Sequence, residues 1–435
     1  MDPTSFNTLL SDRWFLNDEE YLSQWTTEAP DGSLCVESVM SIRQAREFVE
    51  RARGRRPADW LTSKHLGTAL HITGDSEEGL IHLRRAVEQH RSPTTMIDLA
   101  IVLDSLGRFD EALELSREAY EMDNENQFSG LQYSNDLLRQ GRLYEGFSVS
   151  EQICWDAYWY RELKQHIPRW EGEALAGKRL LVVKNGGYGD NILFYRQFLW
   201  LKYLGAHVTY ACPAEMVSLF MRQGWIDAIL GMKGKPKEHQ EMEFDPRDFD
   251  CFIPMMSITH RLGPETLGWP GVYMECGAPL DFGKRGKPLV GICWTAGEIM
   301  DPRKGRSLSN AQVCAIVRSA DVDWISLSYG CGSVDGVADP EPAIGNWLDT
   351  ADVIAGLDLV VTVDTGVAHL AGAMGKPVWV VLPTMSAWMY FLSEDSTPSY
   401  PTARLFRSAG AFGISDETVA RLCGELGRAA EEVGA

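Results

Sequence analysis

The chain shows two successive patterns of hydrophobic and polar positions. Up to about residue 157, apolar residues recur with the spacing of amphipathic α-helices. From about residue 178, short apolar runs such as "RLLVVK" (179–184) and "DLVVTVD" (358–364) alternate with helical stretches. Strands that alternate with helices are typical of parallel sheets. The pattern therefore predicts an all-α N-terminal part followed by an α/β part.

Three segments of the helical part share one phase. Gly74, Gly107 and Gly141 each separate two helical patterns, and they stand 33 and then 34 residues apart. Small residues recur at matching offsets, where the two helices of a hairpin repeat would cross closely. These residues are Gly67, Gly79 and Ala86 in the first unit, Ala100, Ala112 and Ala119 in the second, and Ser134 and Gly146 in the third, where Ile153 breaks the pattern. We expect helical hairpins over residues 58–157, preceded by a helical cap within residues 1–57.

Two strand–helix halves follow the hairpins. In the first, residues 158–282, strands are expected at 179–184, 207–212 and 250–255, with helices at 191–205 and 214–224. In the second, residues 283–435, strands are expected at 288–294, 323–329, 358–364 and 377–383. The segment "GAPLDFGKRGKP" (277–288) suits a linker between them. Two Rossmann-like domains joined in this way place a ligand in a cleft between the carboxyl ends of their strands.

The clearest candidate site lies in "VTVDTGVAHLAGAMGKPVWVVLP" (361–383), which reads as strand, turn, helix, turn and strand. The first amides of that helix have no partner within the helix, and Gly366 permits close approach, so this position suits a diphosphate. Thr365 and His369 are four residues apart and share one helix face. A lone helical histidine is more often structural, but its place beside a diphosphate seat favours a role in binding.

A second glycine-rich turn, "NGGYGD" (185–190), also joins a strand to a helix. Such turns usually bind phosphate, yet Asp190 at the helix start would repel one. As a dinucleotide fingerprint it is incomplete, because Ile192 stands where G-x-G-x-x-G/A requires a small residue. The acidic residue expected about twenty positions later is also missing. A dinucleotide-dependent oxidoreductase is therefore a weaker alternative.

Composition narrows the function classes. The formal net charge of -20 makes nucleic acid an unlikely main partner. The nine cysteines are an odd number without a C-x-x-C motif, which argues for free thiols in a reducing compartment and against a thiolate zinc site. No apolar run is long enough for a transmembrane segment, and residues 1–20 lack the features of a signal peptide, so we expect a cytoplasmic location. The Asp-x-Asp at 321–323 precedes a strand, so we expect no metal site there.

"VDTGVAHLAGAMGKPVWV" (363–380) resembles the donor-binding motif of the heptosyltransferase-like glycosyltransferases, which have the two-domain GT-B fold. The longer run 349–383, together with "SYPTARLFR" (399–407), is similar to bacterial tetratricopeptide-repeat glycosyltransferases, in which helical repeats precede this catalytic unit. The similarity spans most of residues 58–430. It implies that tetratricopeptide-like repeats precede two Rossmann-like domains, which move a sugar from a nucleotide-diphosphate sugar to an acceptor hydroxyl without a cofactor.

The resemblance also implies roles for individual residues. Asp364, Thr365, Gly366 and His369 would hold the donor diphosphate and adjacent groups, together with Trp294, Lys304 and Arg306 in "GICWTAGEIMDPRKGRSL" (291–308). Arg306 is the preferred cation because a guanidinium can bind two phosphate oxygens at once. Asp190 would activate the acceptor, within a loop formed by Asn185, Gly186, Gly187 and Gly189.

The donor base and sugar are not readable from these residues. Two alternatives are open for the acceptor, a protein or peptide held by the repeats and a saccharide. Two are also open for the repeats, acceptor binding and a scaffold role for the next domain. An alternative from another class is a non-catalytic repeat scaffold that only binds a nucleotide sugar.

Overall fold

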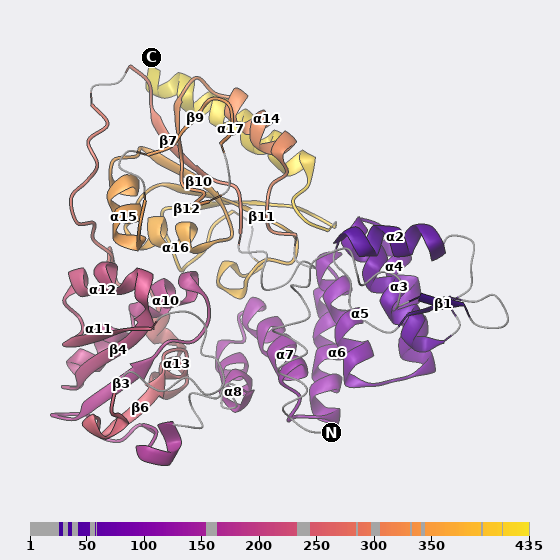
Figure 1. Ribbon diagram of the computed structural model, residues 1–435, viewed down its shortest axis with the longest axis horizontal. Helices are drawn as coiled ribbons and strands as arrows, with labels where there is room; N and C mark the ends of the chain where they lie inside the picture. Colours follow the sequence, from indigo (N-terminus) through magenta and orange to yellow (C-terminus); the bar gives the residue numbers. More distant parts are fainter. Residues whose placement is uncertain are drawn as a thin grey trace.

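A computed structural model places helical hairpins ahead of two parallel sheets (Figure 1). It describes residues 26–28, 34–36, 42–52, 57, 59–153, 163–232, 244–283, 286–296, 305–330, 333–340, 344–392, 395–410 and 412–434. The predicted fold class is therefore confirmed. No helix among these residues is both long and apolar enough to cross a membrane.

The N-terminal part is a row of helices that pack as successive hairpins. A short antiparallel pair, which the sequence did not predict, precedes them. The elements are β1 (Thr26–Glu28), β2 (Leu34–Val36), α2 (Ile42–Ala52), α3 (Trp60–Thr73), α4 (Ser76–Gln89), α5 (Pro93–Ser105), α6 (Phe109–Met122), α7 (Gln127–Arg139) and α8 (Leu143–Ile153). Gly74, Gly107 and Gly141 lie in the three turns with φ of 107°, 77° and 79°, a region that glycine enters readily.

The small residues lie where the helices of a hairpin cross, as predicted. A Cβ atom on Gly67 would lie 2.7 Å from the carbonyl oxygen of Gly79, and one on Gly79 would lie 2.6 Å from that of Gly67. The predicted cap helix is α2, which buries Phe48 against Leu66 and Leu70 of α3. This contact covers the apolar face that a terminal hairpin would otherwise expose.

The first sheet has four parallel strands in the order β5-β4-β3-β6. Its strands are β3 (Arg179–Val183), β4 (His207–Pro213), β5 (Ala228–Met232) and β6 (Cys251–Pro254), and its helices are α10 (Tyr188–Tyr195), α11 (Phe198–Tyr203), α12 (Val217–Gln223) and α13 (Ser257–Leu262). The single helix predicted over 191–205 is in fact two. The break coincides with Arg196 and Gln197, whose side chains are buried; Gln197 donates to the Thr266 hydroxyl at 2.7 Å.

The second sheet has six parallel strands in the order β12-β11-β10-β7-β8-β9. Its strands are β7 (Leu289–Cys293), β8 (Asp323–Ser326), β9 (Val337–Ala338), β10 (Leu359–Val363), β11 (Val378–Leu382) and β12 (Ala403–Arg407), and its helices are α14 (Asn310–Arg318), α15 (Trp347–Ala355), α16 (Gly366–Ala373), α17 (Asp416–Gly434) and the short η6 (Trp388–Tyr390). The predicted strands are all present. The hydrophobic pattern missed β5, β9 and β12, which lie at sheet edges.

Both sheets reverse their strand order next to their first strand. In the first sheet β3 lies between β4 and β6, and in the second β7 lies between β8 and β10. Ligands of open parallel sheets bind outside the carboxyl ends of the strands at such a reversal. The loops that follow β3, β7 and β10 are therefore the expected walls of a site.

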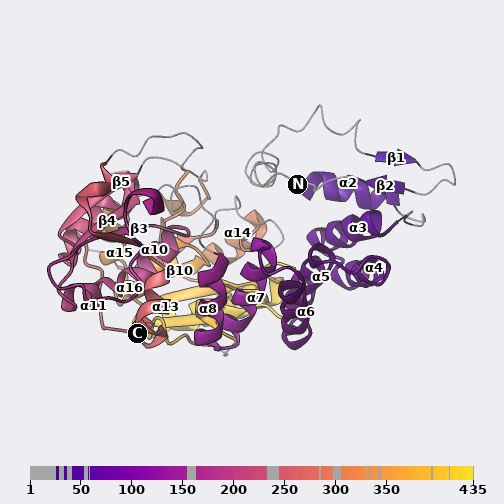
Figure 2. The ribbon, with the colours of Figure 1, turned by 90° about the horizontal axis from the view of Figure 1, so that it is seen from below.

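The last hairpin and the two sheets contribute to one hydrophobic cluster. A single buried cluster includes Leu138 and Phe147 from the last hairpin, Phe194 from α10 and Val360 from β10. Figure 2 shows α7 and α8 beside the α/β part, with α2, α3 and α4 farther away. The last hairpin is thus packed into the α/β part.

Candidate functional site

Helices α10 and α16 bring the two sheets together at the predicted site. Gly189 of α10 lies against the ring of His369 of α16, because a Cβ atom on Gly189 would be 2.5 Å from Cδ2 and 2.9 Å from Nε2 of that ring. A glycine is therefore required here for close approach. The contact places Asp190, the next residue along α10, at the junction of the two predicted domains.

Asp190 occupies the first turn of α10 and is half-buried. Its Oδ2 accepts a hydrogen bond from the backbone N–H of Gly187 at 2.7 Å. Gly186 has φ of 82°, and a Cβ atom there would lie 2.6 Å from Oδ2 of Asp190. The glycines of this loop thus make room for the Asp190 carboxylate and for His369. An acceptor at this position also satisfies an amide at the helix start, which is a structural reason for an aspartate.

Asn185 and Asn191 hold the loop in place. Asn185 Oδ1 accepts from the N–H of Met256 at 2.9 Å, which ties the loop after β3 to the end of β6. Asn191 is fully buried and donates to the carbonyl of Gly187 at 2.7 Å, while the Tyr210 hydroxyl donates to its Oδ1. The Asn185 side chain therefore supports the loop from behind.

His369 is neutral at pH 7 in this environment. Its side chain is buried, and Nδ1 lies 2.8 Å from the Tyr400 hydroxyl. Burial lowers the pKa of His369 to about 4; Asp364 opposes this shift, and the Arg196 and Arg306 cations add to it. The ring can therefore donate at one nitrogen and accept at the other.

Asp364 and Arg306 meet at the carboxyl ends of β10 and β7. Arg306 Nη1 lies 3.5 Å from Asp364 Oδ2 and 3.4 Å from the Asp364 carbonyl oxygen. The Arg306 side chain is about one quarter exposed, with a fractional exposure of 24%. The cation therefore lies at the edge of the site, against a buried carboxylate.

Two buried oxygen atoms at this pair make no well-formed hydrogen bond within the described part of the chain, although one lies 3.5 Å from Arg306 and the Asp364 carboxylate lies near the Tyr390 phenol. They are Asp364 Oδ2 and the hydroxyl oxygen of Tyr390, the last residue of η6. Burial raises the pKa of the Tyr390 phenol well above its usual value, and the nearby Asp364 carboxylate raises it further. Buried polar atoms are nearly always hydrogen-bonded, so these two indicate a place where a ligand or water is bound.

The start of α16 is partly covered by an aromatic ring. Thr365 precedes the helix in an extended conformation, and its side chain makes no capping hydrogen bond. A Cβ atom on Gly366 would lie 2.4 Å from Cη2 of Trp347, so this glycine makes room for an indole. The same indole lies 5.2 Å, centroid to centroid, from the ring of Tyr188 on α10. Trp347 and Tyr188 thus form a second contact between the two halves.

One residue predicted to bind the sugar donor, Trp294, belongs to an apolar cluster. Trp294 follows β7 but is 3% exposed, and its side chain packs in the apolar cluster of the second sheet. Its backbone N–H donates to the Ser328 hydroxyl at 3.0 Å. Lys304 lies outside the described residues.

The hairpins support the loops that carry Arg306 and Tyr390. The rings of Phe147 on α8 and Trp388 of η6 are 5.5 Å apart and edge-on, two residues before Tyr390. His71 on α3 makes a similar contact with Phe412 at 5.0 Å. That phenyl ring in turn lies at Gly305, where a Cβ atom would be 3.2 Å from it. The scaffold role considered for the repeats is thus visible in these contacts.

A buried ion cluster adds a further connection. Arg139 on α7 pairs with Asp104 at 3.0 Å and Asp136 at 3.1 Å, and all three side chains are nearly or fully buried. Its Nε donates to the carbonyl oxygen of Ser386 at 3.3 Å. The Ser386 hydroxyl accepts from Arg407 at 3.0 Å. The segment that leads into η6 is therefore held from both sides.

Sequence reasoning missed three residues that surround His369. They are Arg196, Tyr390 and Tyr400. Tyr400 lies in the run 399–407, whose resemblance to glycosyltransferases was noticed for the segment and not for the residue. Arg196 lies inside an apolar helical stretch of the sequence, where a single charged residue is unusual. Nothing in the pattern around Tyr390 distinguishes it from a core residue.

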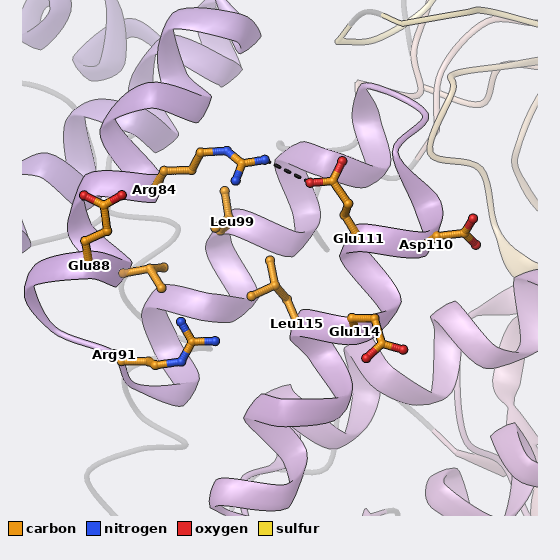
Figure 3. A pocket seen from close by; sticks show the side chains of 9 residues that line it. Arg84, Glu88, Arg91, Leu99, Asp110, Glu111, Glu114 and Leu115 are labelled. Atoms are coloured by element: carbon orange, nitrogen blue, oxygen red, sulfur yellow. Dashed lines mark hydrogen bonds and ion pairs between the residues drawn. The ribbon is translucent and has the colours of Figure 1, made fainter.

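A hollow of about 520 Å³ lies between α4, α5 and α6 (Figure 3). Its floor contains the apolar side chains of Leu99 and Leu115. One rim carries two arginines and Glu88, and the other carries acidic residues of α6. Arg84 pairs across it with Glu111 at 2.9 Å. This hollow is the candidate surface for a partner of the repeats.

Comparison with known proteins identifies the segment around α16. Residues 346–381 match the model of the family described as Glycosyltransferase family 9 (heptosyltransferase). Protein FlbA of Caulobacter vibrioides is 23% identical over 440 residues, which cover 88% of this chain and 70% of FlbA.

Two solved structures resemble the chain at low similarity. The ADP-heptose LPS heptosyltransferase II of E. coli aligns over 59% of this chain and 100% of its own, with 13% identity and a TM-score of 0.42. An O-GlcNAc transferase mutant of Thermobaculum terrenum aligns over 91% of this chain and 90% of its own, with 12% identity and a TM-score of 0.29. Residues 346–381, which include Trp347, Asp364 and His369, thus match a glycosyltransferase family 9 model within a chain of helical hairpins and two parallel sheets.

Proposed function

We propose that the protein is a glycosyltransferase that moves a sugar from a nucleotide-diphosphate sugar to an acceptor hydroxyl. One observation carries the proposal. At the carboxyl ends of β7 and β10, a buried oxygen of Asp364 lies 3.5 Å from the Arg306 cation and near the buried phenol of Tyr390, and the start of α16 follows directly. A ligand with a negative charge for the cation and the helix start, and with hydroxyl groups that donate to the Asp364 oxygen, fits this combination, and a nucleotide-diphosphate sugar has both. The family 9 match lies over the same residues.

The donor diphosphate is bound by the Arg306 side chain and by the backbone amides at the start of α16, where Thr365 and Gly366 lie. Both supply positive potential at a place where the leaving group gains negative charge. Asp364 would repel a diphosphate, so its role is to position Arg306, which lies 3.5 Å away. His369 donates a hydrogen bond to the donor from the adjacent helix face.

Asp190 is the acceptor base. Its carboxylate accepts the proton of the acceptor hydroxyl as that oxygen attacks the anomeric carbon of the sugar. The bond from this carbon to the phosphate oxygen breaks, and the electron pair leaves with the nucleoside diphosphate. Arg306 and the α16 amides stabilise this negative charge, so the scheme requires no metal ion or cofactor.

The acceptor is a protein, a peptide or a saccharide. The hollow between α4 and α6 favours the first two, because its apolar floor and its rims of both charges suit an extended peptide. In Figure 1 these helices lie on the opposite side of α7 and α8 from α10. A peptide bound there must therefore extend past α8 to present its hydroxyl to Asp190.

A two-stage experiment tests this function. Thermal shift with a panel of nucleoside diphosphates and their sugars identifies the donor, because a ligand that binds the native state raises its apparent stability. Chromatography then measures release of nucleoside diphosphate from that sugar, with candidate peptides and oligosaccharides as acceptors. Acceptor-dependent release that Asp190→Asn abolishes supports the proposal. Tight binding without any release would instead favour the non-catalytic scaffold, and binding of nicotinamide or flavin alone would favour an oxidoreductase.

A further inference from the structure

The inference concerns a buried arginine behind His369. Arg196, at the end of α10, is 1% exposed. Its guanidinium donates to the carbonyl oxygen of Leu267 at 2.8 Å, to that of Ser399 at 3.2 Å and to the hydroxyl of Tyr273 at 2.9 Å. All three acceptors are neutral oxygen atoms. A buried cation that is solvated in this way is costly, which is a reason to look for its role.

Aromatic faces complete the surroundings of this cation. The guanidinium carbon lies 4.8 Å from the ring centroid of Tyr273, 5.2 Å from that of Tyr400 and 5.9 Å from that of Trp269. The electron-rich faces of these rings attract a cation. Tyr400 is therefore held between Arg196 on one side and α16 on the other, where a Cβ atom on Gly372 would lie 2.5 Å from the tyrosine ring.

Tyr400 connects this cation to the candidate site. Its hydroxyl lies 2.8 Å from Nδ1 of His369. A phenol is a better donor than a neutral imidazole N–H, and an unprotonated imidazole nitrogen is a better acceptor than a phenol oxygen. The stronger arrangement thus has the Tyr400 O–H donating to Nδ1. The imidazole then carries its one proton on Nε2, the atom that lies toward Gly189 of α10.

We propose that Arg196 and Tyr400 are positioning residues, which hold His369 as the neutral tautomer protonated at Nε2, with that N–H facing the junction with α10. The positive charge of Arg196 disfavours a second proton on the ring, as does that of Arg306, whereas Asp364 favours one. The consequence for the reaction rests on the proposed function: Nε2–H is a fixed hydrogen-bond donor to the nucleotide sugar.

A spectroscopic experiment tests this proposal without sugar transfer. Protein labelled with ¹⁵N-histidine gives long-range ¹H–¹⁵N correlations that distinguish the two tautomers from the cation, and a His369→Gln sample assigns the signals. We expect Nε2 to be protonated and Nδ1 unprotonated, with no change between pH 7.5 and pH 5.5. Protonation at Nδ1, or a cationic ring in this range, would overturn the proposal.

Variants then separate the effect of the Tyr400 hydroxyl from the effect of its ring packing. Tyr400→Phe keeps the ring but removes the donor, so we expect a mixture of tautomers at His369. Tyr390→Phe is the matched control, because the Tyr390 ring lies 6.2 Å from that of His369 while the hydrogen bond to Nδ1 comes from Tyr400. Arg196→Lys retains a cation and should keep the Nε2–H form. An unchanged tautomer in Tyr400→Phe would contradict the proposal.

Sugar-transfer activity is a second measurement, which separates failure of the proposed function from failure of the positioning role. If the protein transfers sugar, Tyr400→Phe should lower kcat about tenfold, with a smaller change in KM, because a mispositioned donor acts mainly in the transition state. If no sugar is transferred but the tautomer is as expected, the proposed function fails and the positioning role stands. If sugar is transferred but the tautomer differs from the expected one, only the positioning role fails.

Discussion

The imidazole of His369 occupies the space that a side chain on Gly189 would need. A Cβ atom there would be 2.5 Å from Cδ2 of the ring, much closer than non-bonded carbon atoms approach. Because Gly189 lies on α10 and His369 on α16, this contact sets how closely the two sheets approach. It also fixes the position of Asp190 relative to the start of α16.

We therefore expect Gly189→Ala to hold the two helices apart. Sugar transfer should fall at least about tenfold, since displacement of a reacting group by a fraction of an ångström is costly in catalysis. Gly424→Ala is the control, because a Cβ atom in that part of α17 meets open space. Steady-state kinetics of the two variants make the comparison. Equal activity in both would show that the contact is not needed.

Asp190→Asn separates the two roles of this residue. An asparagine oxygen can still accept from the N–H of Gly187, so the start of α10 should remain intact. Transfer should fall by at least about 100-fold because the base is lost. Asp190→Ala should add a stability loss of about 1 kcal/mol. Chemical unfolding and transfer assays on both variants test this, and wild-type turnover in Asp190→Asn would exclude the base role.

Two buried histidines predict a loss of stability in acid. Burial lowers the pKa of His65 and of His369 to about 4, from the usual 6.5. Between these values the unfolded chain binds protons that the folded chain does not. The stability that the neutral rings confer is therefore complete above about pH 6.5 and is lost as the pH falls toward 4. Each histidine should cost about 2 kcal/mol at pH 5.

Urea unfolding at pH 7.5 and pH 5 measures this loss. His65→Gln should be the less pH-dependent protein, because it lacks one of the two titrating rings. The comparison between wild type and variant removes the contribution of all other groups. Parallel pH profiles would contradict the assignment for His65.

Phe147→Ala tests the support that the hairpins give to η6. Phe147 is 3% exposed and contacts Trp388, so its loss should cost about 3 to 5 kcal/mol. Because Trp388 leads directly to Tyr390, donor binding should weaken as well. Leu131→Ala, at an exposed site of α7, is the control. Unfolding and donor titration measure both effects; a destabilised variant with wild-type affinity would show that the contact is only structural.

Most of the fold was predictable from the sequence, but less of the candidate site was. The regular spacing of the turn glycines and the small residues at matching offsets predicted the hairpins, because helices that cross closely tolerate only small side chains. The contact of Gly67 with Gly79 shows this. Buried strands such as β3, β7 and β10 were predicted because they are continuous apolar runs. Edge strands were missed. The strand β5, for example, has partly exposed residues and no continuous apolar run.

The site was predictable where it is local in sequence. Asp364, Thr365, Gly366 and His369 follow one strand, so a single motif contained them. The contacts of that motif with Arg196 and Tyr400 depend on tertiary structure and are not encoded in any spacing. The same holds for the close packing of Trp347 on Gly366.

Calorimetric titration of the nucleoside diphosphate into wild type and Arg306→Ala tests the central claim most directly. Arg306 lies 3.5 Å from the buried carboxylate of Asp364, next to the start of α16, where the donor diphosphate is proposed to bind. Loss of a charge-assisted clamp should weaken binding about 10- to 100-fold. Arg428→Ala, an exposed arginine on α17, should bind like wild type. Equal affinity of wild type and Arg306→Ala would contradict the donor site at the carboxyl ends of β7 and β10.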